Sequence, residues 1–283
     1  MLTIIHKLKK IKSHLFKKPY FKHSDVKIGR NVIFGKNIVF NCKRVRIGDG
    51  VIFQNNITIN CDVFEIGDYG TIYTNCFFPG PGILKIGHNF WLGAGSIIDS
   101  QGGTTIGNNV GIGAGSQLWT HVAFGDVMYG SRFHSKKSLT IGDDSWLVGH
   151  CLVSPVNIQP KSIAMLGSVI TKDMKENHCY AGVPAEDLTD KIGHQFKITS
   201  IDQRMAYMQE RIEEFARNYS IENLSKYIKI VDESKMMNDA NDNIIVFNVA
   251  DRTYTKRRSL MEYKLIRFLL PDAKFIPFSS TGQ

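Results

Sequence analysis

Isoleucine followed by glycine recurs at a nearly constant interval along the first half of the chain. These pairs begin at Ile28, Ile47, Ile66, Ile86, Ile106 and Ile141. The first four gaps are 19, 19, 20 and 20 residues, and the fifth is 35, which corresponds to one more period with an insertion of about sixteen residues. Within a period the apolar positions stand about six residues apart, as at Ile106, Ile112 and Leu118. Hexapeptide spacing of this kind predicts three short strands in each coil of a parallel β-helix.

A coil of three strands cannot bury its inner face alone, so the coils must stack. At a strand separation of about 4.8 Å the stacked coils form one apolar column, and the backbone groups of each coil pair with those above and below. Like residues one period apart, such as the Asn-Cys pairs at 41–42 and 60–61, are then expected to form ladders. The repeats run from Val26 to about Ala185, which predicts about eight coils once the insertion is removed. A β-sandwich with evenly spaced turns is the alternative, but it does not account for the hexapeptide spacing.

The first 25 residues predict a basic amphipathic helix ahead of the repeats. Its apolar face repeats at helical spacing and comprises Leu2, Ile5, Leu8, Ile11 and Leu15. Seven lysines and no acidic residue fall in residues 1–24. Such a helix could cap the open first coil, as terminal repeats require, or lie weakly on an anionic membrane surface. We favour the cap, and the two roles are compatible. No groove with interleaved basic and aromatic residues indicates a nucleic-acid partner.

The pattern changes after residue 188, where the hexapeptide spacing stops. The predicted elements beyond it are two helices, over residues 200–217 and 260–270, and strand-like runs over residues 227–231, 244–249 and 274–278. This small α/β appendage carries no catalytic motif that we can name. Three regions are thus predicted, an N-terminal capping helix, an all-β β-helix domain with one extruded loop, and the appendage, with bounds 1–25, 26–188 and 189–283.

The composition is that of a folded globular domain with a basic bias. Apolar residues make up 43% of the chain and charged residues 22%, and the formal net charge is +9. No run of eighteen apolar residues predicts a membrane span, and no apolar segment followed by a cleavage site predicts a secretory signal. The five cysteines are odd in number and form no Cys-x-x-Cys pair, which indicates buried thiols in a reducing compartment. We therefore expect a cytoplasmic protein, which its basic N-terminus could bring to the inner membrane face.

Residues 141–188 carry a more specific signal than the repeats alone. Trp146 follows an Ile-Gly-Asp run, a Gly-Ser-Val-x-Thr-Lys-Asp segment begins at Gly167, and an Ala-Gly-Val-Pro-Ala sequence ends at Ala185. Together and in this order, the three motifs resemble the closing repeats of hexapeptide-repeat acyltransferases, a family of left-handed β-helices that includes bacterial sugar and polysaccharide acetyltransferases. The resemblance covers residues 26–188. It implies left-handed coiling, a homotrimer, and acetyl-CoA bound in clefts between subunits.

The resemblance also implies a catalytic histidine beside the loop that interrupts one coil. The matching residue is His121, which stands just before the insertion at 122–138. A sugar hydroxyl is a weak nucleophile near neutral pH, and an imidazole with an ordinary pKa near 6.5 can take its proton as it attacks a thioester. A base of this kind typically contributes about 10²–10⁴-fold to the rate. His134, inside the insertion, is the second candidate.

Two further groups of candidates follow from the resemblance and from the insertion. The acetyl-CoA contacts carried over from the family are Trp146, Gly149, Leu166, Thr171 and Lys172. The insertion is the expected site of acceptor recognition, because rigid scaffolds place recognition on loops. Its candidates for binding a sugar are Asp126, Tyr129, Arg132 and His134. Glu186-Asp187 stands where several relatives have a basic residue, so the 3′-phosphate of CoA needs a cation elsewhere, such as Lys191 or the basic N-terminus.

The leading prediction is an acetyl-CoA-dependent O-acetyltransferase that acts on a sugar hydroxyl of a bacterial surface polysaccharide or its precursor. N-acetylation of a nucleotide-linked amino sugar is the alternative; an essential base favours the hydroxyl only modestly, because an amine is the better nucleophile. A non-catalytic β-helix scaffold is a further alternative, which the presence of His121 disfavours. A metalloenzyme that resembles γ-type carbonic anhydrases would need three converging histidines. No close pair such as His-x4-His is present, so no metal cofactor is expected.

Overall fold

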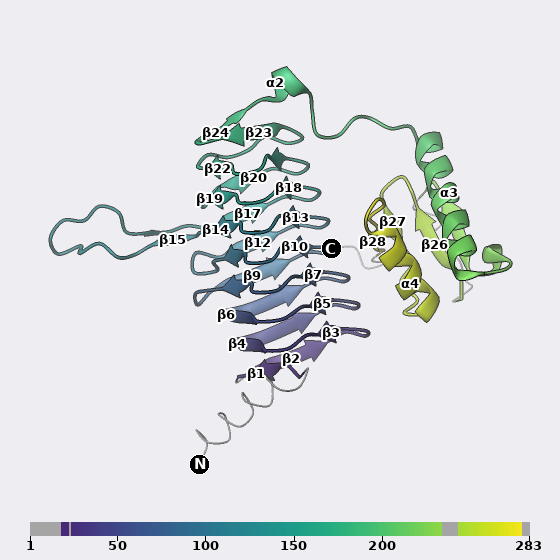
Figure 1. Ribbon diagram of the computed structural model, residues 1–283, viewed down its shortest axis with the longest axis horizontal. Helices are drawn as coiled ribbons and strands as arrows, with labels where there is room; N and C mark the ends of the chain where they lie inside the picture. The colour runs from purple at the N-terminus through teal and green to yellow at the C-terminus, as the bar shows by residue number, and fades with distance from the viewer. Residues whose placement is uncertain (1–17, 23, 234–242, 279–283) are drawn as a thin grey trace, which may run out of the picture. The chain divides into compact units, whose positions relative to one another are not determined.

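A computed structural model describes residues 18–22, 24–233 and 243–278, so most of the predicted N-terminal helix lies outside the described residues. The chain divides into two compact units, one that ends at Phe196 and one that begins at Lys197. The first unit holds the β-helix and the second holds the α/β appendage (Figure 1). The boundary follows residue 196 rather than 188 because hydrogen bonds tie the short helix α2 (Thr189–Ile192) and Gly193 to β23 (Cys179–Gly182).

Each coil of the first unit contributes strands to three faces, which we call A, B and C in the order in which the chain visits them. Face A contains β1 (Tyr20–Phe21), the first halves of β4 (Ile38–Ile47) and β6 (Ile57–Ile66), β8 (Phe77–Phe78), β11 (Ile97–Ile98), β14 (Gln117–Leu118), β19 (Leu152–Val153) and β22 (Val169–Ile170). Face B contains β2 (Asp25–Ile28), the second halves of β4 and β6, β9 (Ile83–Ile86), β12 (Thr104–Ile106), β17 (Leu139–Ile141) and β20 (Asn157–Ile158). Face C contains β3 (Ile33–Phe34), β5 (Ile52–Phe53), β7 (Thr71–Ile72), β10 (Trp91–Leu92), β13 (Gly111–Ile112), β18 (Trp146–Leu147), β21 (Ile163–Ala164) and β23, with β24 (Ala185–Asp187) antiparallel at its end.

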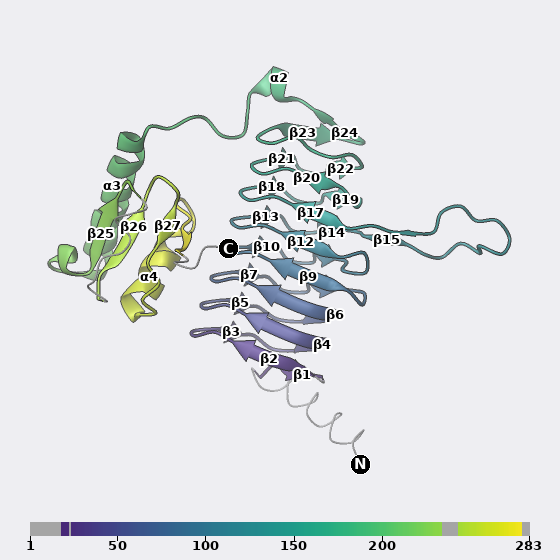
Figure 2. The same cartoon turned by 180° about the vertical axis from the view of Figure 1, so that it is seen from behind.

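The stack has the number of coils that the repeat predicts. Face C holds eight strands that pair in parallel from β3 to β23, which correspond to eight coils (Figures 1 and 2). The architecture is consistent with the left-handed β-helix that the closing motifs indicate. The first strand, β1, already pairs with β4 at Tyr20 and Phe21, so the stack begins a few residues before Val26.

One column of side chains from face A shows how the repeat becomes a core. Its inward residues are Phe40, Ile59, Phe78, Ile98, Leu118, Val153 and Ile170, which are at most 2% exposed. Each such side chain, fully buried, contributes about 1.5–3 kcal/mol relative to exposure in water. Because every coil repeats the same inward positions, the column is continuous from one end of the stack to the other.

The predicted ladders are present on successive coils. Asn41 donates from Nδ2 to Oδ1 of Asn60 at 2.7 Å, and the sulfurs of Cys42 and Cys61 lie 3.6 Å apart inside the core. The ladder prediction is therefore confirmed.

A second ladder explains why glycine follows isoleucine in each repeat. From the second Ile-Gly pair onward, the side chain of the residue after the pair accepts a hydrogen bond from the backbone of the coil before it, as Asp68 Oδ1 does from Asp49 N at 2.7 Å. This brings the coils so close that a Cβ on Gly48 would lie 2.5 Å from Asp68 Oδ1. A side chain there would have to push the coils apart, so only glycine fits.

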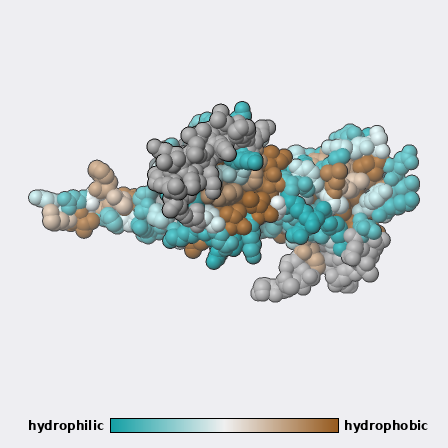
Figure 3. Space-filling view, turned by 90° about the horizontal axis from the view of Figure 1, so that it is seen from below, coloured by the Kyte–Doolittle hydropathy of each residue, from teal (hydrophilic) through white to brown (hydrophobic). Residues whose placement is uncertain are grey.

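The end of the stack where the chain enters leaves apolar side chains exposed. Ile28 and Ile33 are 43% and 48% exposed, and Figure 3 shows hydrophobic side chains gathered at this end. An apolar end of this kind is what a terminal cap would cover. The cap itself stays a prediction, because residues 1–17 lie outside the described residues.

The insertion forms a hairpin that leaves the stack at the edge between faces A and B. Its neck is the antiparallel pair β15 (His121–Val122) and β16 (Ser135–Lys136). Figures 1 and 2 show the loop projecting away from the β-helix. Phe124 and Met128 are 101% and 84% exposed, and Figure 3 shows brown and tan side chains along this loop.

The second unit is an α/β fold that contains the expected helices and strands, together with a short strand at Thr253–Tyr254 and a 3-10 turn that the sequence did not predict. In chain order these are α3 (Ile201–Tyr219), a 3-10 turn η1 (Leu224–Lys226), β25 (Ile228–Val231), β26 (Ile245–Asn248), β27 (Thr253–Tyr254), α4 (Leu260–Leu269) and β28 (Ile276–Pro277). The strands form one sheet in the order β25-β26-β27-β28. In the described part of the chain, no helix combines the length and the apolar character needed to cross a membrane.

Candidate active site

His121 lies where the regular coil gives way to the extruded loop. Strand β14 before it is held in register between β11 and β19, with Leu118 opposite Ile98 and Val153. The chain then turns outward at Trp119 and Thr120 instead of continuing directly to face B. The rigid stack therefore fixes the backbone that enters His121, while its side chain stays 25% exposed.

His121 is paired with a buried carboxylate on the preceding coil. Its Nδ1 lies 2.7 Å from Oδ2 of Asp99, whose side chain is fully buried. The same oxygen accepts a 2.9 Å hydrogen bond from Thr120 N and a short one from the Thr120 hydroxyl. The other oxygen accepts from Gln101 N at 3.1 Å. We call Thr120, Asp99 and His121 the relay.

The hydrogen bonds of the relay fix where its protons lie. The Thr120 hydroxyl oxygen accepts from Gly102 N at 2.9 Å, so its one hydrogen is directed at Asp99. Burial disfavours the charged carboxylate, but the hydrogen bonds from Thr120 and His121 outweigh it and lower the pKa of Asp99 below its ordinary value. An ionised Asp99 only accepts, so His121 Nδ1 carries the proton. The Nε2 lone pair of the neutral ring is then available as a base.

Trp119 is a neighbour of this base that sequence reasoning did not select. Its ring centre lies 6.3 Å from that of His121, and 37% of the residue is exposed. Its indole Nε1 donates to Oε1 of Gln117 at 3.2 Å, which orients the ring. Its position could have indicated this neighbour, because Trp119 is an aromatic residue two positions before the histidine at which the insertion begins.

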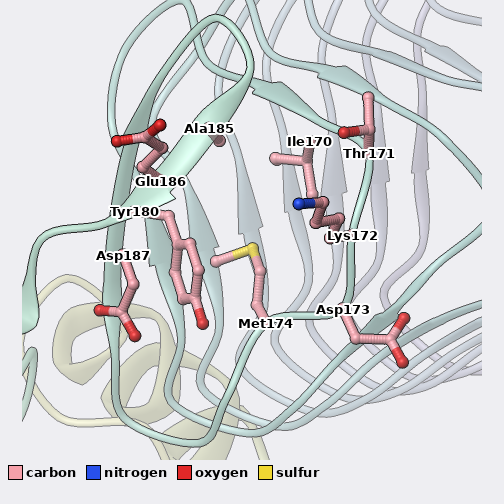
Figure 4. A pocket seen from close by; sticks show the side chains of 9 residues that line it. All are labelled: Ile170, Thr171, Lys172, Asp173, Met174, Tyr180, Ala185, Glu186 and Asp187. Carbon is pink, nitrogen blue, oxygen red and sulfur yellow. The ribbon is translucent and has the colours of Figure 1, made fainter.

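Thr171 and Lys172 lie on the same edge of the stack as the relay. They follow β22, which is two strands along face A from β14, and they line a pocket of about 240 Å³ at the last coils (Figure 4). Met174 and Tyr180 stand at its centre, and Glu186 lies on the side opposite Lys172 (Figure 4). The pocket combines an apolar floor with a charged rim of both signs.

The other three residues carried over for acetyl-CoA lie elsewhere on the stack. Gly149 and Leu166 are neighbours at the edge between faces C and A, where a Cβ on Gly149 would come within 3.3 Å of Leu166 Cδ1. Trp146 lies on face C, is 46% exposed, and rests against Gly111 of the preceding coil. A single chain therefore does not assemble all five residues into one cleft.

The loop candidates for acceptor binding lie at different distances along the hairpin from its neck, where His121 stands. Asp126 Oδ1 accepts from Met128 N at 2.9 Å and from Tyr129 N at 3.3 Å, so this carboxylate closes the loop's own turn. Tyr129, Arg132 and His134 are exposed, and the tip of the loop projects away from the stack (Figure 2). Of the four candidates, His134 lies next to the hairpin neck.

Metal-binding groups were sought over residues 18–22, 24–233 and 243–278. No set of three or more His, Cys, Asp or Glu side chains there is arranged to hold a metal ion. The five cysteines are buried and free.

Comparison with known proteins gives a sequence relative and several structural ones. No protein-family model matches the chain. The chain is 29% identical over 119 residues to galactoside O-acetyltransferase of Escherichia coli (strain K12), which covers 40% of this chain and 58% of that protein. The solved structure of the polysialic acid O-acetyltransferase OatWY matches with a TM-score of 0.48 and 19% identity, over 70% of this chain and 95% of that one. The polySia-specific acetyltransferase NeuO matches with a TM-score of 0.41 and 18% identity, over 69% and 94% of the two chains.

The stacked hexapeptide repeats make the first unit a parallel β-helix, with an extruded hairpin whose neck begins at His121. Its sequence relative is a sugar O-acetyltransferase, so the resemblance indicated by the closing motifs is confirmed. The chain spans 58% of the length of that relative.

Proposed function

We propose that the protein is an acetyl-CoA-dependent O-acetyltransferase that acts on a sugar hydroxyl of a bacterial surface polysaccharide or of its precursor. The relay carries this proposal, because it presents an oriented imidazole with a free Nε2 at a partly open edge of the fold. The similarity to galactoside O-acetyltransferase supports the class of reaction.

In the proposed reaction His121 acts as a general base and then as a general acid. Nε2 takes the proton of the acceptor hydroxyl while its oxygen attacks the carbonyl carbon of the acetyl thioester, and a C–O bond forms. The Asp99 carboxylate, 2.7 Å from Nδ1, stabilises the imidazolium that results. As the C–S bond breaks, the imidazolium returns the proton to the departing thiolate. The products are an acetyl ester and the free thiol of CoA.

Trp119 is the proposed platform for the acceptor sugar. An exposed indole whose orientation is fixed by Gln117 offers a flat apolar surface beside His121. The C–H faces of a pyranose can pack on such a ring and leave the hydroxyls free to face the imidazole. Arg132, His134 and Tyr129 are kept as candidates to contact the acceptor from the loop.

A homotrimer is part of the proposal. Thr171 and Lys172 lie on one edge of the stack, whereas Gly149 and Leu166 lie on another. If they share one acetyl-CoA, the edge of one subunit must face a different edge of its neighbour, which is the heterologous contact of a cyclic oligomer. Lys172 would then supply a cation for a phosphate of CoA, and the acidic rim around Glu186 would lie away from it.

N-acetylation of a nucleotide-linked amino sugar is the alternative within the same class. An amine needs less help from a base than a hydroxyl does. The fully formed relay therefore favours the hydroxyl.

The cellular location is proposed from the sequence. Five free and buried cysteines suit a reducing cytoplasm, and the seven N-terminal lysines would allow weak, salt-sensitive contact with an anionic membrane face.

The proposal is tested with purified protein, acetyl-CoA and a panel of sugars, nucleotide sugars and glycan fragments, by following release of free thiol. His121→Asn should lower kcat by about 10²–10⁴-fold and leave CoA affinity and Tm nearly unchanged. His150→Asn is the matched control, because His150 is exposed and has a positive φ of 50° that asparagine tolerates. A His121→Asn enzyme that keeps more than about a third of the wild-type rate would remove His121 from the mechanism.

A further inference from the structure

A second imidazole is oriented by the same chain of hydrogen bonds at the end of the β-helix. Cys179 N donates to the hydroxyl oxygen of Thr189 at 3.0 Å, and that hydroxyl donates to Asp187 Oδ1 at 2.6 Å. His178 Nδ1 lies 2.7 Å from the other oxygen, Asp187 Oδ2. In the first relay the backbone N–H of Gly102 has the place that Cys179 N has here.

The protons of this second group are fixed by the same reasoning. Asp187 Oδ1 accepts from Thr189 N at 3.0 Å as well as from the Thr189 hydroxyl. A carboxylate held this way accepts from His178 too, so His178 Nδ1 is the donor and Nε2 carries the lone pair. Lys175 Nζ, 3.8 Å from Asp187 Oδ2, adds a positive charge on the side of the carboxylate.

A second histidine with the same free nitrogen lies beside it. His194 Nδ1 is 3.1 Å from the backbone oxygen of Asn177, and a carbonyl only accepts, so Nδ1 carries the proton there as well. The side chain of Asn177 holds the chain just beyond, through bonds with Phe196 N at 2.8 Å and Phe196 O at 3.0 Å. The turn that carries His194 is thus pinned to the last coil.

The two rings are spaced as ligands of one ion would be. Their centres are 5.3 Å apart and their planes are inclined at 73°. Two imidazoles on a tetrahedral ion, each with a nitrogen–metal distance of about 2.0–2.1 Å, have ring centres roughly 5 Å apart. Histidine ligands typically donate their other N–H to a carboxylate or a backbone carbonyl, and His178 and His194 have one of each.

We propose that Nε2 of His178 and Nε2 of His194 bind a divalent transition-metal ion, of the zinc, nickel or copper class, at the C-terminal cap of the β-helix. Imidazole suits these ions better than it suits calcium or magnesium. The chain supplies two ligands, and water fills the remaining positions. Because His178 belongs to the last coil and His194 to the turn after α2, a bound ion would fasten the cap.

The test uses untagged full-length protein, so that no added histidines compete, and Zn²⁺ followed by calorimetry. One ion per chain is expected, with affinity at least tenfold weaker in His194→Ala and in His178→Ala. Asp187→Asn should weaken binding by about 10–100-fold, as loss of an outer partner does. His150→Asn is the control and should bind as the wild type does. Zn²⁺ should raise the Tm of the wild type and of His150→Asn but not that of His194→Ala.

Spectra of the Cu²⁺ form give a second readout that does not depend on affinity. Electron paramagnetic resonance should show coupling to two nitrogen ligands in the wild type and to fewer in His194→Ala. His194 is exposed and its side chain makes one hydrogen bond, so this variant should fold even where His178→Ala does not. Equal Zn²⁺ affinity of wild type and His194→Ala, or equal loss in His150→Asn, would overturn the proposal.

Discussion

Replacing Asp99 by asparagine removes the charge of the relay and little of its volume. The amide oxygen can take the place of Oδ2 and still accept from Thr120 and His121. The amide NH₂ then faces Gln101 N, a donor that now lacks its acceptor. The variant therefore keeps the histidine near its position but withdraws the negative charge that faces the imidazolium.

The size of the effect follows from that charge. A unit pair with charge centres about 4 Å apart interacts by about 4 kcal/mol at an effective dielectric constant of about 20. A neutral hydrogen bond from His121 to the amide oxygen of the new side chain would retain about 1 kcal/mol. The remaining loss of about 3 kcal/mol applies to the imidazolium formed in the reaction, which corresponds to a kcat about 100-fold lower. Acceptor KM should stay within about threefold, because Asp99 is buried beneath the site and does not contact the sugar.

The assay is initial thiol release over a range of acceptor concentrations, with Tm measured on the same samples. Asp49→Asn is the matched control: Asp49 is another buried carboxylate that accepts a backbone N–H, from Arg30 at 2.7 Å, but it lies coils away from His121. The control should keep wild-type kcat. A kcat for Asp99→Asn above about a third of the wild-type value would refute the reasoning, as would a loss confined to KM.

The remaining predictions concern acceptor binding, the coil stack, acid stability and the N-terminus. Trp119→Ala should raise the acceptor KM about tenfold and leave kcat within about threefold, and Trp119→Phe should restore most of the acceptor binding. Initial rates over a range of acceptor concentrations measure both constants, and an unchanged KM in Trp119→Ala would exclude Trp119 as the platform. His88 Nδ1 accepts a hydrogen bond from Asp68 N, and in the next coil Asn108 Oδ1 accepts one from His88 N, each at 2.9 Å, so His88→Asn should keep the wild-type Tm. His88→Leu removes the acceptor and should lower the free energy of unfolding by about 1–2 kcal/mol. Equal Tm values for the two variants would contradict the role of this ladder. Because the pKa of Asp99 is lowered in the folded state, its ionised form stabilises the fold above pH 3.8, and this stabilisation is lost as the pH falls below 3.8 through the folded-state pKa. In acid unfolding followed by circular dichroism, the stability of Asp99→Asn should therefore fall less steeply with decreasing pH than that of the wild type. Deletion of residues 1–17 should lower Tm if they cap the first coil and should abolish salt-sensitive pelleting with anionic vesicles if they bind membranes, and a deletion without either effect would exclude both roles.

The fold could be predicted from the sequence because a β-helix repeats over about 20 residues. Each coil meets its neighbours one period away, so the inward positions, the ladders at 41–42 and 60–61, and the number of coils follow from spacing alone. The position of His121 at the base of the extruded loop could also be predicted, because an insertion can leave the stack only at a turn and this insertion begins directly after His121.

The tertiary structure decided what happens at the edges. Asp99 precedes Thr120 by 21 residues, close to one period, but only the turn geometry shows that its carboxylate bends under the edge to reach His121. The same geometry separates Thr171 from Gly149, although both belong to the closing motifs, and brings His194 beside His178 from beyond the last coil. The sequence period reports which residues stack, since strands on a face repeat in register. It does not report the path of turns whose lengths differ from coil to coil, and the relay and the two proposed metal ligands lie at those turns.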